Sequence, residues 1–173
     1  FSVFLTNEPY SLVIRQSIFY LLGIIIILIM LKINPHKLIK YSFYIYLINV
    51  LLLILVLFIG TEINGARAWF SIPIIGTFQP SEFMKIGLIL YIAKIIDNHK
   101  IKNYKDELLL ILKVFIITII PGIITFLEPD TGAVLIYFVI AFVMLFTSNI
   151  RYRWFILFFS IILIIGILFL YLY

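Results

Sequence analysis

The 173-residue sequence contains no cysteine and few charged residues. Without cysteine, the chain can form neither a disulfide framework nor a cysteine-ligated metal site. Only 12% of its residues are charged, whereas a soluble domain carries about 25%. Hydrophobic residues make up 65% of the chain, which is more apolar surface than a water-soluble core of this size can bury. Lipid must therefore cover part of the surface, and we expect a membrane protein.

The net charge of +5 could suggest a nucleic-acid partner. The basic residues, however, form short clusters between apolar runs, which is the pattern of loops between membrane helices. We therefore predict no nucleic-acid partner and assign the positive charge to loops on one side of a membrane.

Five apolar runs are long enough, or nearly so, to cross a bilayer, which takes roughly 20 residues. In lipid each run must be helical, because an open strand would leave its backbone groups without hydrogen bonds. The runs are residues 17–33, 41–59, 108–127, 131–148 and 154–173.

A sixth run, residues 83–96, is short and contains two lysines, so its length alone does not decide whether it crosses. Two basic clusters, residues 32–40 and 94–105, flank the segment that holds this run, and the positive-inside rule places both in the cytoplasm. An even number of crossings must then separate them, so residues 83–96 must cross back. The sequence predicts an all-α bundle of six transmembrane helices in one domain, residues 1–173, incomplete at both ends.

Residues 60–79 would form an outer loop. Asn64 and Gly65 mark a turn. Trp69 and Phe70 suit an aromatic anchor at the membrane interface. Either a plain interfacial loop or a segment that dips into the outer membrane surface fits this pattern.

The next segment brings charges to the outer end of a helix. Pro80 fits the first helical position, which places Glu82 in the first turn, where a carboxylate complements the helix N-terminus. Lys85 follows three residues later, on the same face. A structural ion pair is one interpretation. A functional site is the other, since ionisable residues within a membrane are costly.

Glu128, Pro129 and Asp130 repeat this arrangement at the second outer turn, where helix capping is as good an interpretation as function. The outer face would then gather two helix N-termini, Arg67, Lys85 and three carboxylates. Helix N-termini and basic groups bind phosphate, and carboxylates could hold a divalent cation such as Mg²⁺ or Mn²⁺ that bridges to it. Such a cluster suits the pyrophosphate headgroup of a lipid.

Two stretches resemble the signatures of a known family. NGARAWF, with FQPSEFMKI after it, spans residues 64–86, and LEPDTGAVLI spans residues 127–136. Both resemble the SEDS family, which includes RodA, FtsW and SpoVE. The second stretch usually carries Gln where this chain has Glu128. The roughly 40-residue spacing of the two stretches also agrees, and the resemblance covers essentially the whole chain.

The resemblance implies a ten-helix protein of the bacterial cytoplasmic membrane that polymerises lipid II, of which this chain would be the second to seventh helices. It implies that Arg67, Gln79, Glu82 and Lys85 line a central cavity that opens outward, with Asp130 in the second outer turn. The presumed catalytic aspartate of the family would lie after Tyr173, so no catalytic residue is expected in these 173 residues. The implied partners are lipid II, the glycan linked to undecaprenyl pyrophosphate, and a class B penicillin-binding transpeptidase.

The function that we expect is therefore a peptidoglycan glycosyltransferase of elongation, division or sporulation, inactive as this piece alone. A flippase for lipid-linked precursors, or another membrane transporter, is the alternative, because it too needs charges in a membrane cavity. A noncatalytic scaffold for the transpeptidase is a third possibility.

Overall fold

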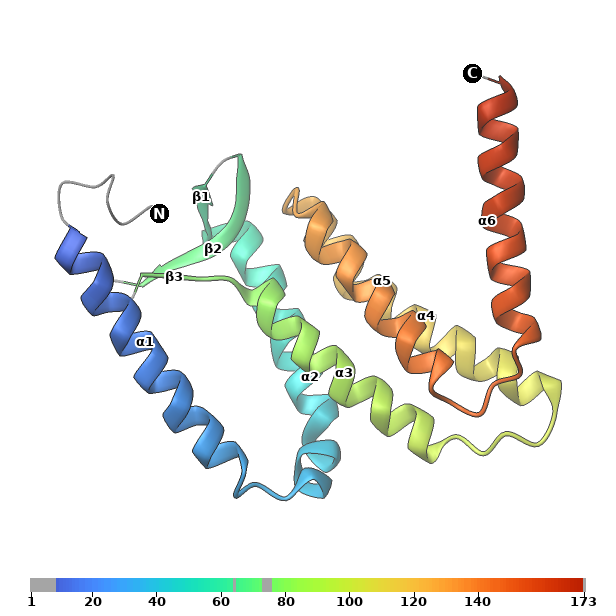
Figure 1. Cartoon of the computed structure of the whole chain (residues 1–173), viewed down its shortest axis with the longest axis horizontal. Coiled ribbons are helices and arrows are strands. Elements are labelled where there is room, and N and C mark those ends of the chain that lie inside the picture. Colours follow the sequence, from blue (N-terminus) through green and yellow to red (C-terminus); the bar gives the residue numbers. More distant parts are fainter. Residues whose placement is uncertain (1–8, 64, 73–75, 173) are drawn as a thin grey trace. The chain divides into compact units, whose positions relative to one another are not determined.

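The computed structural model describes residues 9–63, 65–72 and 76–172. The chain divides into two compact units, Phe1–Leu38 and Ile39–Tyr173 (Figure 1). The first unit contains helix α1, Pro9–Met30, and the opening residues of α2, Pro35–Ile59. The second unit contains the rest of α2 and all that follows, including both segments that resemble the family signatures.

The described residues form six helices, in agreement with the predicted all-α transmembrane fold. After α1 and α2 these are α3 Pro80–Asn98, α4 Tyr104–Leu127, α5 Thr131–Phe146 and α6 Arg153–Leu172. Helix α2 and helix α4 are each long and apolar enough to span a membrane. Helices α1 to α4 begin earlier than predicted, because each opens with a stretch that contains polar or charged residues, which a search for apolar runs leaves out.

A small antiparallel sheet of three strands lies between α2 and α3, and the sequence did not predict it. Its strands are β1 Thr61–Ile63, β2 Ala66–Ile72 and β3 Gly76–Phe78, in the order β1-β2-β3. Trp69 pairs with Thr61, and Phe70 pairs with Phe78 and stacks on its ring. The argument against strands applies only to runs inside lipid. This segment lies between the helices, and its side chains alternate between two faces as in a β-strand.

The turn between β1 and β2 needs a residue with positive φ, and Gly65 has a φ of 82°. This conformation agrees with the turn predicted there, although Asn64 lies outside the described residues.

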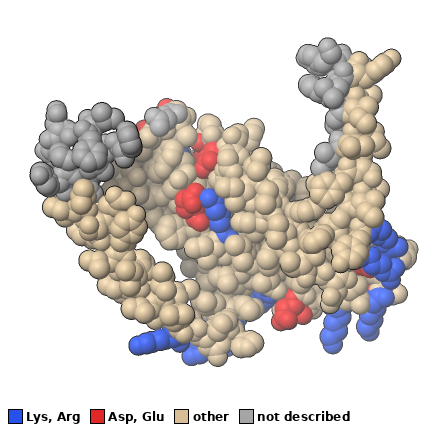
Figure 2. Space-filling model, viewed as in Figure 1, with Lys and Arg blue, Asp and Glu red and all other residues tan. Residues whose placement is uncertain are grey.

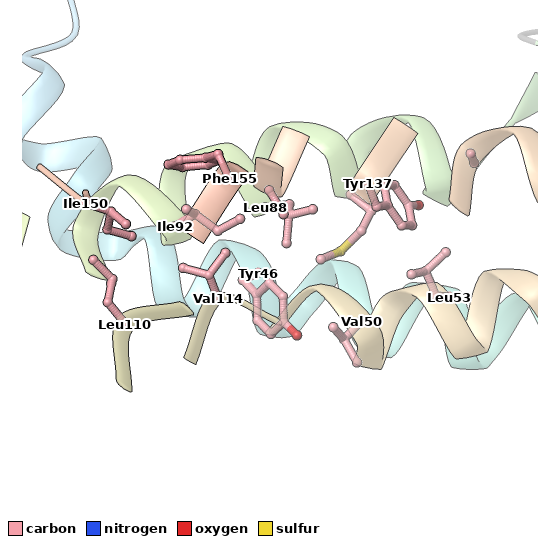
Figure 3. Packing of buried hydrophobic residues seen from close by; sticks show 13 residues of the cluster. Tyr46, Val50, Leu53, Leu88, Ile92, Leu110, Val114, Tyr137, Ile150 and Phe155 are labelled. Carbon is pink, nitrogen blue, oxygen red and sulfur yellow. The ribbon is translucent and has the colours of Figure 1, made fainter. Parts of the chain in front are cut away.

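Helices α3, α4 and α5 pack against one another, and their contact surfaces form an apolar core (Figure 3). Side chains from α2 extend it on one side, and Ile150 and Phe155 extend it near the start of α6. The fully buried members include Leu53, Met84, Leu88, Ile92, Leu110, Val114 and Tyr137.

The crossing of α2 and α3 is close because α3 has a glycine there. A Cβ atom on Gly87 would lie 3.1 Å from Asn49 Nδ2 and 3.4 Å from Tyr46 Cα. The Tyr46 hydroxyl then donates a hydrogen bond of 2.9 Å to the backbone carbonyl of Ile117, which links α2 to α4. Small residues at such contacts let helix backbones approach in a membrane.

A buried carboxylate ties α4 to the turn before α6. Glu107 is 1% exposed and accepts a hydrogen bond of 2.6 Å from the Trp154 indole. Its other carboxylate oxygen lies 3.0 Å from Arg151 Nε, and Arg153 contributes a further ion pair at 3.6 Å. The start of α4, which follows the basic cluster 94–105, and the basic turn before α6 therefore meet at one end of the bundle.

We expect Gly87→Ala and Gly122→Ala to differ in sign. Alanine favours a helix over glycine by about 1 kcal/mol at either position. A Cβ on Gly122 would make ordinary contacts of 3.8 Å and 3.9 Å, whereas one on Gly87 would press on α2. In detergent, Gly122→Ala should raise the melting temperature and Gly87→Ala should lower it. Equal stabilisation by both would contradict a tight α2–α3 crossing.

Candidate functional site

The Asp130 carboxylate joins the two segments that the sequence placed at the outer face. One oxygen, Oδ2, accepts hydrogen bonds from Gln79 Nε2 at 2.9 Å and from Ser81 Oγ at 3.2 Å. The other, Oδ1, accepts from the backbone N–H of Ala133 at 3.1 Å and so caps the start of α5. Capping, one of the two interpretations of this turn, is confirmed, but Asp130 is the N-cap residue before Thr131 and does not lie in the first turn, and Pro129 precedes the cap instead of opening the helix. The same carboxylate also reaches the start of α3.

Buried hydroxyl groups continue this network toward the core. Tyr137 of α5 donates a hydrogen bond of 3.0 Å to the backbone carbonyl of Ser81, and Thr125 of α4 donates one of 3.5 Å to the Tyr137 hydroxyl. The sequence reasoning did not single out Ser81, Thr125 or Tyr137. Their hydroxyls within or beside apolar runs were the available signal, because polar groups in a membrane bundle need partners.

Glu82 and Lys85 form the predicted ion pair, with a distance of 2.6 Å between Lys85 Nζ and Glu82 Oε1. The Lys85 side chain is 20% exposed and the Glu82 side chain 56% exposed, so the pair lies at the surface of the described bundle. Figure 2 shows one blue and red pair near the start of α3, whereas other basic groups of the second unit gather where α4 and α6 begin. Because the pair is exposed, its contribution to stability is small, about 1 kcal/mol or less.

Arg67 stands apart from these groups. It lies on β2 with an exposed side chain. Among the residues that the structure describes, it makes no ion pair and no side-chain hydrogen bond. The structure therefore brings Gln79 and Asp130 together, pairs Glu82 with Lys85, and leaves the Arg67 guanidinium available for another partner. The outward cavity that the resemblance implies stays a prediction.

Glu128 lies in the turn between α4 and α5 with no exposed surface. Within the described residues, neither of its carboxylate oxygens has a hydrogen-bond partner. Burial, with a smaller contribution from the nearby Asp130 carboxylate, raises the pKa of the Glu128 carboxyl from 4.5 to about 8. At neutral pH the group is therefore mostly protonated and resembles, in charge, the glutamine usual at this position in the SEDS family.

The predicted divalent cation finds few ligands here. The described residues contain no group of three Asp, Glu or His side chains placed to hold a metal ion. Asp130 already accepts three hydrogen bonds, and Glu128 is buried and mostly protonated. These residues do not fit a metal site by themselves.

The comparison with known proteins agrees with this arrangement. Residues 2–173 match the family model FTSW_RODA_SPOVE, described as cell cycle protein. The chain belongs to this family. The resemblance read from the two sequence motifs is therefore confirmed, and the chain is a membrane protein of the SEDS type.

Two curated relatives are both named as peptidoglycan glycosyltransferases. The chain is 34% identical over 142 residues to the probable peptidoglycan glycosyltransferase FtsW of Haemophilus influenzae, which covers 82% of this chain and 36% of that protein. It is 32% identical over 143 residues to the peptidoglycan glycosyltransferase MrdB of Helicobacter pylori, with coverages of 81% and 37%. The chain thus spans a little over a third of the length of these relatives.

Solved structures show the same fold. The rod shape determining protein RodA of Thermus thermophilus matches with a TM-score of 0.73 at 31% identity, over 90% of this chain and 50% of that one. A second structure, described as "Structural coordination of polymerization and crosslinking by a peptidoglycan synthase complex", matches with a TM-score of 0.77 at 31% identity. It covers 90% of this chain and 45% of that chain.

We expect Glu128→Gln to remove a pH dependence of stability. The Glu128 carboxyl binds its proton more tightly in the folded chain than in the unfolded chain, where its pKa has the ordinary value of 4.5. The free energy of unfolding of the unsubstituted protein should therefore fall as the pH rises from about 4.5 to about 8. Melting temperatures of both proteins at about pH 5 and pH 8.5 test this. Parallel curves for the two proteins would contradict it.

Asp130→Ala should cost more stability than Gln79→Ala. The first removes the α5 cap and both side-chain bonds, about 2 kcal/mol or more, whereas the second removes one hydrogen bond, about 1 kcal/mol. Since Gln79 bonds only to Asp130 among the described side chains, adding Gln79→Ala to Asp130→Ala should cost little more. Chemical unfolding in detergent measures the cycle. Full additivity of the two substitutions would show that the Gln79–Asp130 bond contributes nothing.

Proposed function

We propose that the protein containing these residues is a peptidoglycan glycosyltransferase that polymerises lipid II at the outer face of the bacterial cytoplasmic membrane. The observation that carries the proposal is the family match over residues 2–173. Relatives that share about a third of their residues with this chain over more than four fifths of its length are named as such transferases. The polar cluster around the start of α3 adds chemical support.

In the reaction, a hydroxyl group on the sugar of one lipid-linked substrate attacks the anomeric carbon of the other. The bond to the undecaprenyl pyrophosphate breaks, and the pyrophosphate leaves with the electron pair. A base takes the proton of the attacking hydroxyl. Two requirements follow for the protein, namely a general base and groups that stabilise the negative charge of the leaving pyrophosphate.

Lys85 and Arg67 are the groups that we assign to the pyrophosphate. The Lys85 ammonium donates one hydrogen bond to Glu82 and has two further protons to offer. It lies in the second turn of α3, whose N-terminus favours anions. The exposed Arg67 guanidinium can bind a second phosphate oxygen.

Gln79 and Asp130 are positioning residues in this proposal. Their hydrogen bond fixes the start of α3 against the start of α5, and with it the direction of the α3 N-terminus. We assign the general base to a part of the protein outside these residues, as the resemblance implies. A divalent cation, if one takes part, would likewise need ligands from outside the described residues.

We also propose a class B penicillin-binding transpeptidase as the partner. One structure similar to this chain is that of a peptidoglycan synthase complex that coordinates polymerisation and crosslinking. Crosslinking is the chemistry of a transpeptidase, so a protein of this family acting in such a complex would meet one at the same face of the membrane.

Substitutions of the Glu82–Lys85 pair test the proposal. In the protein from the complete gene, we expect Lys85→Met to reduce lipid II polymerisation by at least tenfold with little loss of stability, because the pair is exposed. The double variant Glu82→Gln/Lys85→Met should fold and remain as inactive as Lys85→Met. The measurements are glycan-strand synthesis from purified lipid II and the melting temperature in detergent.

Lys100→Gln, at an exposed lysine in the connection that follows α3, is the matched control and should polymerise lipid II normally. A fully active double variant would show that Glu82 and Lys85 only stabilise the structure and take no part in the reaction. Vesicles in which the unsubstituted protein moves lipid II across the membrane without polymerising it would favour the flippase alternative instead.

A further inference from the structure

A pocket lined by two lysines and by aromatic rings lies between α2, α3 and α4, away from the outer cluster. It has a volume of about 530 Å³. Its polar and aromatic lining comes from three helices and the residue after α3: Tyr44, Tyr91, Lys94, Asn98, His99 and Lys113. Because α3 rises about 1.5 Å per residue, Lys94 lies roughly 14 Å along the helix from Lys85. The two sites are therefore distinct.

The pocket carries two positive charges and no negative one among its described lining residues. Neither lysine forms an ion pair with any carboxylate that the structure describes. Asp106 is the acidic residue at the adjoining start of α4, and its carboxylate accepts hydrogen bonds from the backbone N–H groups of Lys102 and Asn103. The positive charge of the pocket is therefore not balanced within the described structure.

The two lysines are placed differently. Lys94 is half-buried, and its Nζ donates a hydrogen bond of 3.1 Å to the backbone carbonyl of Lys40 in α2, which leaves two protons for a ligand. Lys113 lies nine residues into α4, roughly 13 Å from the helix start, where an unpaired ammonium in lipid is costly. An anion in the pocket would remove that cost.

The surroundings indicate what kind of anion. The pocket opens near the end of the bundle where α3 ends and α4 begins, and the basic connection between these helices is predicted to be cytoplasmic. There His99 Nε2 lies 2.8 Å from the backbone carbonyl oxygen of Asp106, a contact between the two ends of the connection. The aromatic rings of Phe43, Tyr44 and Tyr91 give the pocket an apolar side, and exposed apolar residues of α2 and α4 continue from it.

We propose that this pocket binds the phosphate group of an anionic phospholipid, with Lys94 and Lys113 as its two cationic ligands and the acyl chains along α2 and α4. The volume suits a phosphoglycerol headgroup, and basic pockets between transmembrane helices on the cytoplasmic side bind such headgroups. Phosphate from a soluble molecule could supply the same chemistry, but it would leave the apolar side of the pocket unused. The site does not depend on the proposed transferase activity.

Lipid titration followed by native mass spectrometry tests the proposal. The purified protein in detergent is titrated with phosphatidylglycerol, or with phosphatidylcholine of the same acyl chains, and the bound lipid is measured after release from the detergent. Phosphatidylcholine has the same phosphate, but its choline cation makes the headgroup zwitterionic. We expect phosphatidylglycerol to bind at least tenfold more tightly. Lys113→Gln should weaken this binding by threefold or more, and Lys94→Gln/Lys113→Gln should abolish the preference. Lys113→Arg keeps the cation and should keep the preference.

Lys100→Gln/Lys105→Gln is the matched control, because it removes the same charge from the neighbouring basic connection outside the pocket. It should change binding by less than twofold. Equal affinity for the two lipids, or an equal loss in the control, would overturn the proposal. Displacement of the lipid by millimolar glycerol phosphate would overturn the assignment to a lipid. Lys113→Gln removes no hydrogen bond of the described structure, so a folded variant with unchanged lipid preference would refute the site.

Discussion

Lipid offers no hydrogen bonds, so polar groups inside a membrane bundle must find partners within the protein. The structure meets this constraint at both ends of its helices. At one end the Asp130 carboxylate joins the starts of α3 and α5, and at the other Glu107 joins the start of α4 to the turn before α6. Apolar packing between these ends resembles packing against lipid tails, so the polar bonds specify which helices meet.

Glu128 is the exception, and its environment explains why it is tolerated. Its carboxyl is buried and has no hydrogen-bond partner among the described residues. It lies near the Asp130 carboxylate, which accepts three hydrogen bonds. Burial raises its pKa to about 8, which lets the group stay neutral at physiological pH. A neutral acid in this turn adds no second negative charge beside the Asp130 carboxylate, which accepts the hydrogen bonds of Gln79 and Ser81.

Helix α3 carries both proposed sites because it joins the two ends of the bundle. Its first two turns present Glu82 and Lys85, and its last two turns present Lys94 and Asn98. The close α2–α3 crossing at Gly87 and the hydrogen bond of Tyr137 to Ser81 fix the helix between them. A lipid bound at one end and a lipid-linked substrate at the other would thus contact the same rigid element.

The sequence by itself determined the helices, the Glu82–Lys85 pair and the cap at Asp130, because each depends on residues near one another in the chain and on the length of a bilayer. It also determined the family, through the motifs around Arg67, Gln79 and Glu128. The sequence did not predict the short sheet, since a turn and an aromatic anchor in residues 60–79 are equally typical of an interfacial loop. Only the tertiary structure decided that Asp130 bonds to Gln79 and Ser81, about 50 residues away, that Glu107 is buried against Arg151, and that Lys94 and Lys113 face one pocket. Those contacts depend on how the helices cross, and apolar runs without a polar face do not specify a crossing.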